Sequence, residues 1–137
     1  MRLVIIAAAA GAAALASPVV ADAPSPLPPA PPAGTGLADS ECLLAHEIGN
    51  HSVVDGKTLL LSGFGRSRGT YRVTMRKACL RGAVSADPIS LTGPQTRGRI
   101  CKPTHLDISA RSGHCYVDSI VKLTPQEVAA LPRRLKP

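Results

Sequence analysis

Hydrophobic and polar residues alternate most clearly between residues 53 and 76. Val53 and Val54 precede Asp55-Gly56, a pair typical of the tight turn between two antiparallel strands, and a β-like run follows at 57–64. After a glycine-rich turn at 65–69, apolar Tyr71, Val73 and Met75 alternate with polar Thr70, Arg72, Thr74 and Arg76. Because a period of two is that of a half-buried strand, the pattern predicts two adjacent hairpins and hence an antiparallel meander.

The rest of the chain carries weaker signals. Residues 39–48 fit either a short helix or an extended segment, and proline and glycine interrupt 80–98. Short strands are predicted near 89–91, 99–101, 106–109 and 115–122. Thr124-Pro125-Gln126-Glu127 is a capping box with proline at the first helical position, which predicts a helix of about two turns ending before Pro132. The basic tail 133–137 is expected to fray.

These elements predict a mainly β fold. We expect a small antiparallel sheet or partly open barrel, a meander of short strands with a short C-terminal helix, stabilised by disulfides.

The first residues predict export. Arg2 is followed by about 14 apolar residues and then by Ser17-Pro18, which suits a signal peptide, whereas a transmembrane helix needs about 20. We expect residues 1–21 to be a signal peptide cleaved after Ala21. The expected location is the periplasm, or the exterior as a secreted protein, and the released chain would not be an integral membrane protein.

The next segment, 22–36, is rich in proline. It contains six prolines, which fix φ and remove backbone donors, so we expect an extended linker between the signal peptide and one domain at 37–137. Removing 1–21 takes away one of 16 basic residues and none of the 9 acidic ones, which leaves a net charge of about +6. Such a charge favours anionic partners without selecting one.

Cysteines are expected to stabilise this domain, because only three aromatic residues are available to fill its core. Cys42, Cys79, Cys101 and Cys115 are even in number and belong to an exported chain, which predicts two disulfides with three possible pairings. We favour Cys42 with Cys115 and Cys79 with Cys101, because this nested pattern ties the start of the domain to its last strand and closes the irregular segment 80–100.

The order of these motifs resembles a known family. An early cysteine, VVDGKTLLL, a glycine turn, TYRVTM, Cys79, Ile100-Cys101 and the final LTPQEVA are similar to a family of small exported bacterial proteins catalogued only as a domain of unknown function. The resemblance covers about 42–131 and implies a small, cysteine-containing, mainly β domain of the cell envelope. Many members carry a lipoprotein cysteine that this chain lacks, and the family supplies no catalytic residues.

GRSRG, at 65–69, matches the G-x-S-x-G turn that presents a serine nucleophile in many hydrolases. Asp107 and His114 follow Ser67 in the order of a catalytic triad. That turn should lead from a strand into a helix, however, and the alternation after residue 69 predicts a second strand. We therefore expect no catalytic residues and a protein that is not an enzyme, with a hydrolase kept as a remote alternative.

His46-Glu47 and His51 resemble the H-E-x-x-H zinc motif. The two histidines are five residues apart instead of four, so on a helix they would diverge by about 140°. We expect no metal ligands and no cofactor.

Basic residues carry the functional hypothesis. Between Asp55 and Asp87 the chain has seven Lys or Arg and no acidic residue. Arg66, Arg68, Arg72 and Arg76 are predicted to converge on one hairpin as an anion-binding site, for lipopolysaccharide or phospholipid head groups. Export and the shortage of aromatic residues argue against nucleic acid.

The expected function is binding or a structural role in the cell envelope. One alternative is a binder of anionic envelope ligands through the basic hairpin. The other is a small inhibitor or escort of another envelope protein.

Overall fold

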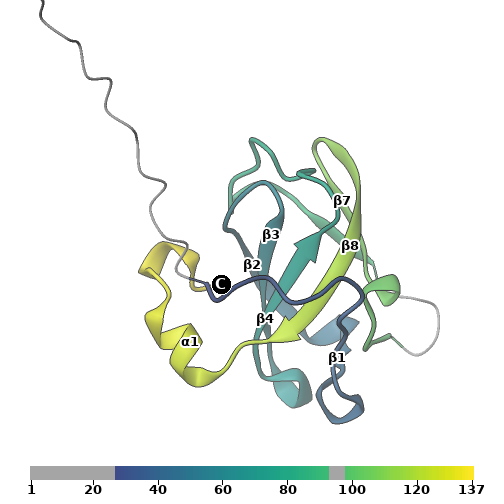
Figure 1. Cartoon of the computed structure of the whole chain (residues 1–137), viewed down its shortest axis with the longest axis vertical. Coiled ribbons are helices and arrows are strands. Elements are labelled where there is room, and N and C mark those ends of the chain that lie inside the picture. Colours follow the sequence, from purple (N-terminus) through teal and green to yellow (C-terminus); the bar gives the residue numbers. More distant parts are fainter. Residues whose placement is uncertain (1–26, 93–97) are drawn as a thin grey trace, which may run out of the picture.

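The computed structural model describes residues 27–92 and 98–137, so the predicted signal peptide, 1–21, lies outside the described residues. Its main element is a curled, half-barrel antiparallel sheet of six strands (Figure 1). In spatial order the strands are β2 (Ile48–Val53), β3 (Thr58–Gly63), β4 (Gly69–Met75), β8 (Gly113–Lys122), β7 (Asp107–Ala110) and β5 (Ser90–Thr92). The predicted mainly β fold is confirmed.

Two short strands form a separate ladder. β1 (Leu43–Leu44) pairs with β6 (Arg99–Ile100), and 3₁₀ turns at Asp39–Glu41 and Ala45–Glu47 flank β1. Residues 39–48 are thus neither one helix nor one strand. The chain ends with α1 (Pro125–Ala130) and a 3₁₀ turn at Arg133–Leu135.

The meander predicted from 53–76 is confirmed. β2 and β3 pair across the Asp55-Gly56 turn, where the Asp55 carboxylate accepts the Lys57 N–H at 2.7 Å, and β3 pairs with β4 in an unbroken register. β8 then adds to the free edge of β4. This third pairing joins segments far apart in sequence, and it places the end of β8, and hence the start of α1, beside β4.

The sheet has two faces, which alternate along each strand. The inner face, which includes Leu59, Tyr71, Val73 and Ile120, packs against β1 and β6 in the main core. The outer face carries Leu60, Arg72, Ser119 and Leu123. Its apolar residues form a second, smaller cluster with Leu131 and Leu135.

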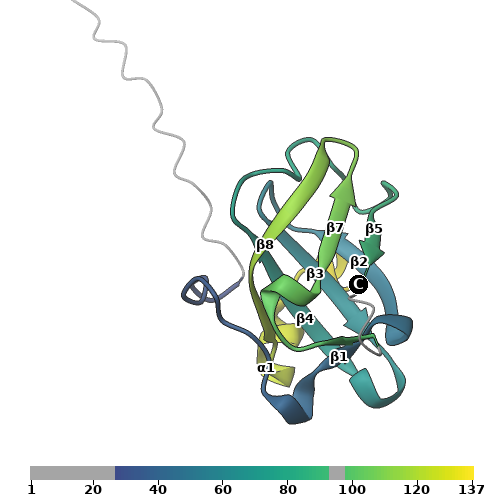
Figure 2. The same ribbon diagram turned by 90° about the vertical axis from the view of Figure 1, so that its right-hand side faces the viewer.

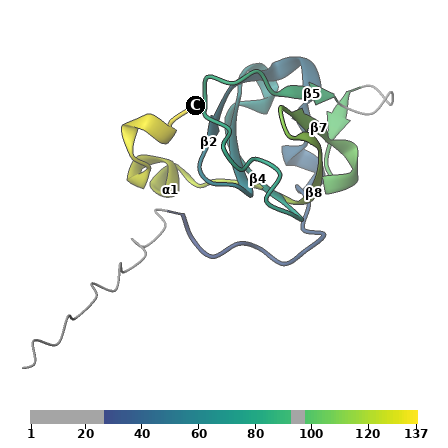
Figure 3. The same ribbon diagram turned by 90° about the horizontal axis from the view of Figure 1, so that it is seen from above.

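Both ends of the described chain cover the outer face. α1 and the turn after it lie on one side, and residues 27–36, which we call the strap, cross β4 and β8 (Figures 1 and 3). Gly34 N–H donates to Asp118 O at 2.8 Å, and Ile120 N–H donates to Thr35 O at 2.9 Å. Residues 27–36 of the segment predicted to be a linker therefore pack against the domain.

The tail is also better fixed than predicted. Leu135 is buried in the second cluster, so residues 133–135 are an anchored turn. The capping box is confirmed: Thr124 Oγ1 accepts the Glu127 N–H, and the Glu127 carboxylate accepts the Thr124 N–H. The helix is thereby oriented so that the following leucines reach the sheet.

The predicted disulfide pairing was wrong. Cys42 bonds to Cys101, and Cys79 bonds to Cys115. The reason for the first bond is the β1–β6 ladder, because Leu43 pairs with Ile100 and the next residues outward, Cys42 and Cys101, therefore face each other. The second bond forms because the turn after β4 folds back beside β8, which Figure 2 shows from the side of β7.

Two disulfides indicate an oxidising and hence exported environment. Within the described residues, no helix has the length and hydrophobicity needed to cross a membrane.

Candidate functional site

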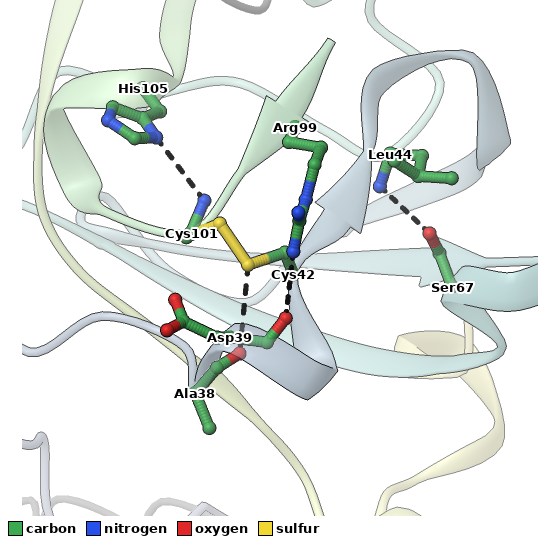
Figure 4. Close-up of a disulfide and its surroundings, with 8 residues drawn as sticks. All are labelled: Ala38, Asp39, Cys42, Leu44, Ser67, Arg99, Cys101 and His105. Atoms are coloured by element: carbon green, nitrogen blue, oxygen red, sulfur yellow. Dashed lines mark hydrogen bonds between the residues drawn. A yellow bond between two sulfur atoms is a disulfide. The ribbon is translucent and has the colours of Figure 1, made fainter. Parts of the chain in front are cut away.

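The GRSRG turn is a buried junction around Ser67. The serine is only 1% exposed, and its Oγ accepts the Leu44 N–H at 2.8 Å, which ties the turn to β1 (Figure 4). Its backbone carbonyl accepts the Tyr71 hydroxyl at 2.9 Å. The glycines permit the reversal, since Gly65 and Gly69 have φ of +60° and +147°. Ser67 therefore connects elements of the fold.

Glu47 completes this junction. Its carboxylate accepts the Ser67 N–H at 2.7 Å, and a hydrogen bond from the Ser67 side chain, opposed by partial burial, lowers the pKa of Glu47. Backbone N–H groups of Arg66 and Ser67 lower the pKa further. The acidic residue of the zinc-like motif thus holds the serine of the hydrolase-like motif.

Asp107 and His114 lie far from Ser67. Ser67 precedes β4 at the end where Tyr71 pairs with Lys122, whereas His114 begins β8. Eight residues of extended strand separate positions 114 and 122, which is about 26 Å. His114 Nε2 lies 3.9 Å from Asp107 Oδ1 at that distant end. The structure does not bring the three triad-like residues together.

The histidines are also dispersed. His46 is exposed, and His51 Nε2 lies 3.1 Å from the Asp87 carbonyl oxygen. Over residues 27–92 and 98–137, the one cluster of potential metal ligands consists of Asp39, Cys42 and Cys101. The sulfur atoms of the two cysteines are bonded to each other as a disulfide. Figure 4 shows this disulfide between Asp39, whose carbonyl accepts from Arg99, and His105. It is a staple between β1 and β6.

The four arginines predicted to form one anion site are separated. Arg66 and Arg68 are exposed on the turn before β4. Arg76 is exposed beyond the other end of β4, about 26 Å from Arg68 along the strand. Arg72 is only 4% exposed and lies beneath the strap. The predicted convergence of the four arginines was wrong, because strand alternation shows which residues share a face but does not show whether another segment covers that face.

A different set of residues forms a groove beside α1. It has a volume of about 750 Å³ and lies where β4 begins, β8 ends and the helix starts. Apolar atoms of Leu123, Pro125, Val128 and Ala129 line it. Arg68 and Lys122 also line it, as does Glu41. We call this the basic groove.

Lys122 is the member of the basic groove that the sequence did not reveal. Its Nζ lies 5.8 Å from the centre of the Tyr71 ring, and it sits beside Gly69, where an added Cβ would meet Lys122 Cε at 2.7 Å. The register pairs Tyr71 with Lys122, which brings the lysine next to the arginine turn. The signal was nonlocal, since residues 68 and 122 meet only because β8 adds to β4.

Comparisons with protein-family models, curated proteins and solved structures find no match to the chain.

Proposed function

We propose that this protein is an exported, non-enzymatic binding module, working in the periplasm, that takes an anionic amphiphile in the basic groove. The observation that carries the proposal is the juxtaposition of two cations, Arg68 and Lys122, with an apolar lining that continues onto α1. Cations alone would suit any polyanion. A mostly apolar groove beside them favours a ligand with both an anionic group and a hydrocarbon portion, such as a phospholipid.

The two cations belong to elements that are fixed in place. Arg68 follows the turn that Glu47 and Ser67 hold, and Lys122 ends β8 in register with Tyr71. An anionic group bound in the groove would therefore face two positive charges and the one negative charge of Glu41, without reordering the backbone. This arrangement supports binding of one phosphate or carboxylate at the mouth of the groove.

Vesicle sedimentation tests the proposal. The oxidised protein should bind phosphatidylglycerol vesicles at an ionic strength of about 0.01 M and release them at about 1 M, where the screening length falls to about 3 Å. Phosphatidylcholine vesicles should bind weakly. The double variant Arg68→Gln/Lys122→Gln should lose about 2 kcal/mol, or about 30-fold in affinity, at roughly 1 kcal/mol for each cation near an anionic surface.

A matched control separates the groove from overall charge. Arg76→Gln/Lys77→Gln removes the same charge from exposed positions at the other end of β4 and should bind like the wild type. If both double variants lost the same affinity for the vesicles, binding would depend on net charge alone and not on the groove. Undiminished binding of the groove variant would disprove the proposal, and a salt-resistant complex with an envelope protein would favour the inhibitor or escort role.

A further inference from the structure

Arg72 is a buried cation held by the strap. It is 4% exposed, and its two terminal nitrogens donate to consecutive carbonyls, Nη1 to Pro28 O at 2.6 Å and Nη2 to Pro29 O at 3.0 Å. Burial lowers the pKa of Arg72, while the negative charge of Glu127 acts in the opposite direction. None of the carboxylates in the described chain forms an ion pair with it. The strap carbonyls are thus its closest acceptors.

The strap lies between two hollows on the outer face. Thr70, Arg72 and Thr74 follow one another on this face of β4. Thr70 lines the basic groove, and Thr74 lines a second hollow of about 560 Å³ that Thr58 and strap residue Ala30 also line. Arg72 lies between them under Pro28 and Pro29. The two hollows and the strap-covered site between them form one line, which we call the trough.

The strap fills this position without satisfying all of its polar groups. Arg72 Nε and Ser119 Oγ are buried and have no hydrogen-bond partner in the described part of the protein. Ser119 pairs with Thr74 across the β4–β8 ladder, so it is a diagonal neighbour of Arg72 on the same face. A segment with a further acceptor at this point would satisfy groups that the strap leaves unpaired.

Residues 27–29 of the strap contact the outer face of the sheet through one side chain and two carbonyls. Leu27 packs into the cluster of Leu60, Leu123, Leu131 and Leu135, and the next two residues present their carbonyls to Arg72. Four of the seven residues 27–33 are proline and donate no backbone N–H, so this segment cannot be held by strand pairing along its length. Residues 27–29 thus contribute an apolar side chain and two carbonyl acceptors to this contact.

We propose that the trough is a recognition site for an extended Leu-Pro-Pro segment of a partner polypeptide, and that the chain's own residues 27–30 occupy it as an intramolecular competitor. Proline-rich segments suit such a site because they are already extended before they bind. The tethered strap has a high effective concentration, in the millimolar range for a short connection, so it limits access by a partner. The proposal does not require lipid binding, because residues 28–30 contact Arg72 and the second hollow, and not Arg68 or Lys122.

Fluorescence polarisation with a labelled peptide of residues 27–33, Leu-Pro-Pro-Ala-Pro-Pro-Ala, tests the proposal on the full oxidised protein. Leu27→Ser weakens the internal competitor and leaves the trough intact, so it should raise the affinity for the added peptide about tenfold over the wild type. Leu27→Ser/Arg72→Gln should lose that gain. Leu27→Ser/Arg76→Gln, which removes an exposed arginine outside the trough, should keep it.

A second measurement covers the case in which the Arg72 variant does not fold. A photoreactive group in place of the fourth residue of the peptide, which corresponds to Ala30, should crosslink the wild-type protein near Thr58 or Thr74 at high peptide concentration. Crosslinking elsewhere, or a scrambled peptide of equal composition that binds Leu27→Ser as well, would overturn the proposal. So would a folded Leu27→Ser protein with no gain in affinity. No lipid is present, so these outcomes do not depend on lipid binding in the basic groove.

Discussion

At the scale of single residues, Glu47 and Ser67 show how two enzyme-like motifs can be structural. Each motif placed a reactive residue type at a familiar spacing, yet Glu47 accepts the Ser67 N–H and Ser67 accepts the Leu44 N–H. Buried polar groups need partners, and these residues supply them to each other. The hydrogen bonds of Glu47 and Ser67 therefore stabilise the fold.

The lowered pKa of Glu47 predicts a pH dependence. A carboxyl group whose pKa is lower in the folded state stabilises the protein above its unfolded pKa, about 4.3, and this stabilisation is lost as the pH falls through the folded pKa. Glu47→Gln should be less stable than the wild type near neutral pH, and the difference should shrink below about pH 4. Urea unfolding across this pH range measures it. The exposed Glu41→Gln control should follow the wild type, and a pH-independent deficit in Glu47→Gln would contradict the interpretation.

Arg72 shows the limit of sequence patterns at this scale. Alternation correctly placed it opposite Tyr71 and Val73, on the other face of the strand. Its burial depends on Pro28 and Pro29, more than forty residues away. Nothing local to Arg72 signals that cover, so the residue was assigned to an exposed site.

At the scale of elements, strong local signals predicted structure correctly, whereas the short β1–β6 ladder was not predicted. Asp55-Gly56 and the Thr124 capping box each specify a turn or a helix start within a few residues, and both are present. β1 and β6 pair over two residues each, too few for a recognisable period. Because that ladder sets Cys42 opposite Cys101, missing it led to the wrong disulfides.

Thiol counting tests the disulfide assignment. Cys79→Ser/Cys115→Ser should retain one disulfide, Cys42–Cys101, and show no free thiol. Cys79→Ser/Cys101→Ser, which keeps the pair predicted from sequence, should show two free thiols, because Cys42 and Cys115 bond to different partners. On the chain-entropy model, each native bond, with sequence separations of 59 and 36, contributes about 4 kcal/mol. The reverse pattern of free thiols would restore the sequence-based pairing.

At the scale of the whole molecule, the two ends of the described part of the chain complete a second core on the outer face of the sheet. The sequence indicated one modest core, and the inner face confirms it. The outer cluster was missed because its contributions, Leu27 in a proline-rich stretch and Leu135 in a basic tail, are isolated leucines without a period. The basic groove was missed for a different reason: its lining comes from β4, β8 and α1, which lie together only in the folded protein.

Leu135→Ala tests whether the tail is anchored. The side chain is 6% exposed, so its truncation should cost about 2–5 kcal/mol in the free energy of unfolding, measured by urea denaturation. Val84→Ala, at a side chain that is 58% exposed, should change stability by at most about 0.5 kcal/mol. An equally small effect at Leu135 would show that the tail frays, as the sequence alone suggested.

The cover of the outer face has a consequence for the order in which the protein matures. Leu27 is among the first described residues to be synthesised, yet its cluster includes Leu131 and Leu135, which are synthesised more than a hundred residues later. Until then Leu60 lacks the C-terminal leucines that cover it in the complete fold. A chain that ends before Leu131 would therefore lack two of the leucines of this cluster and leave Leu60 and Leu123 without that cover.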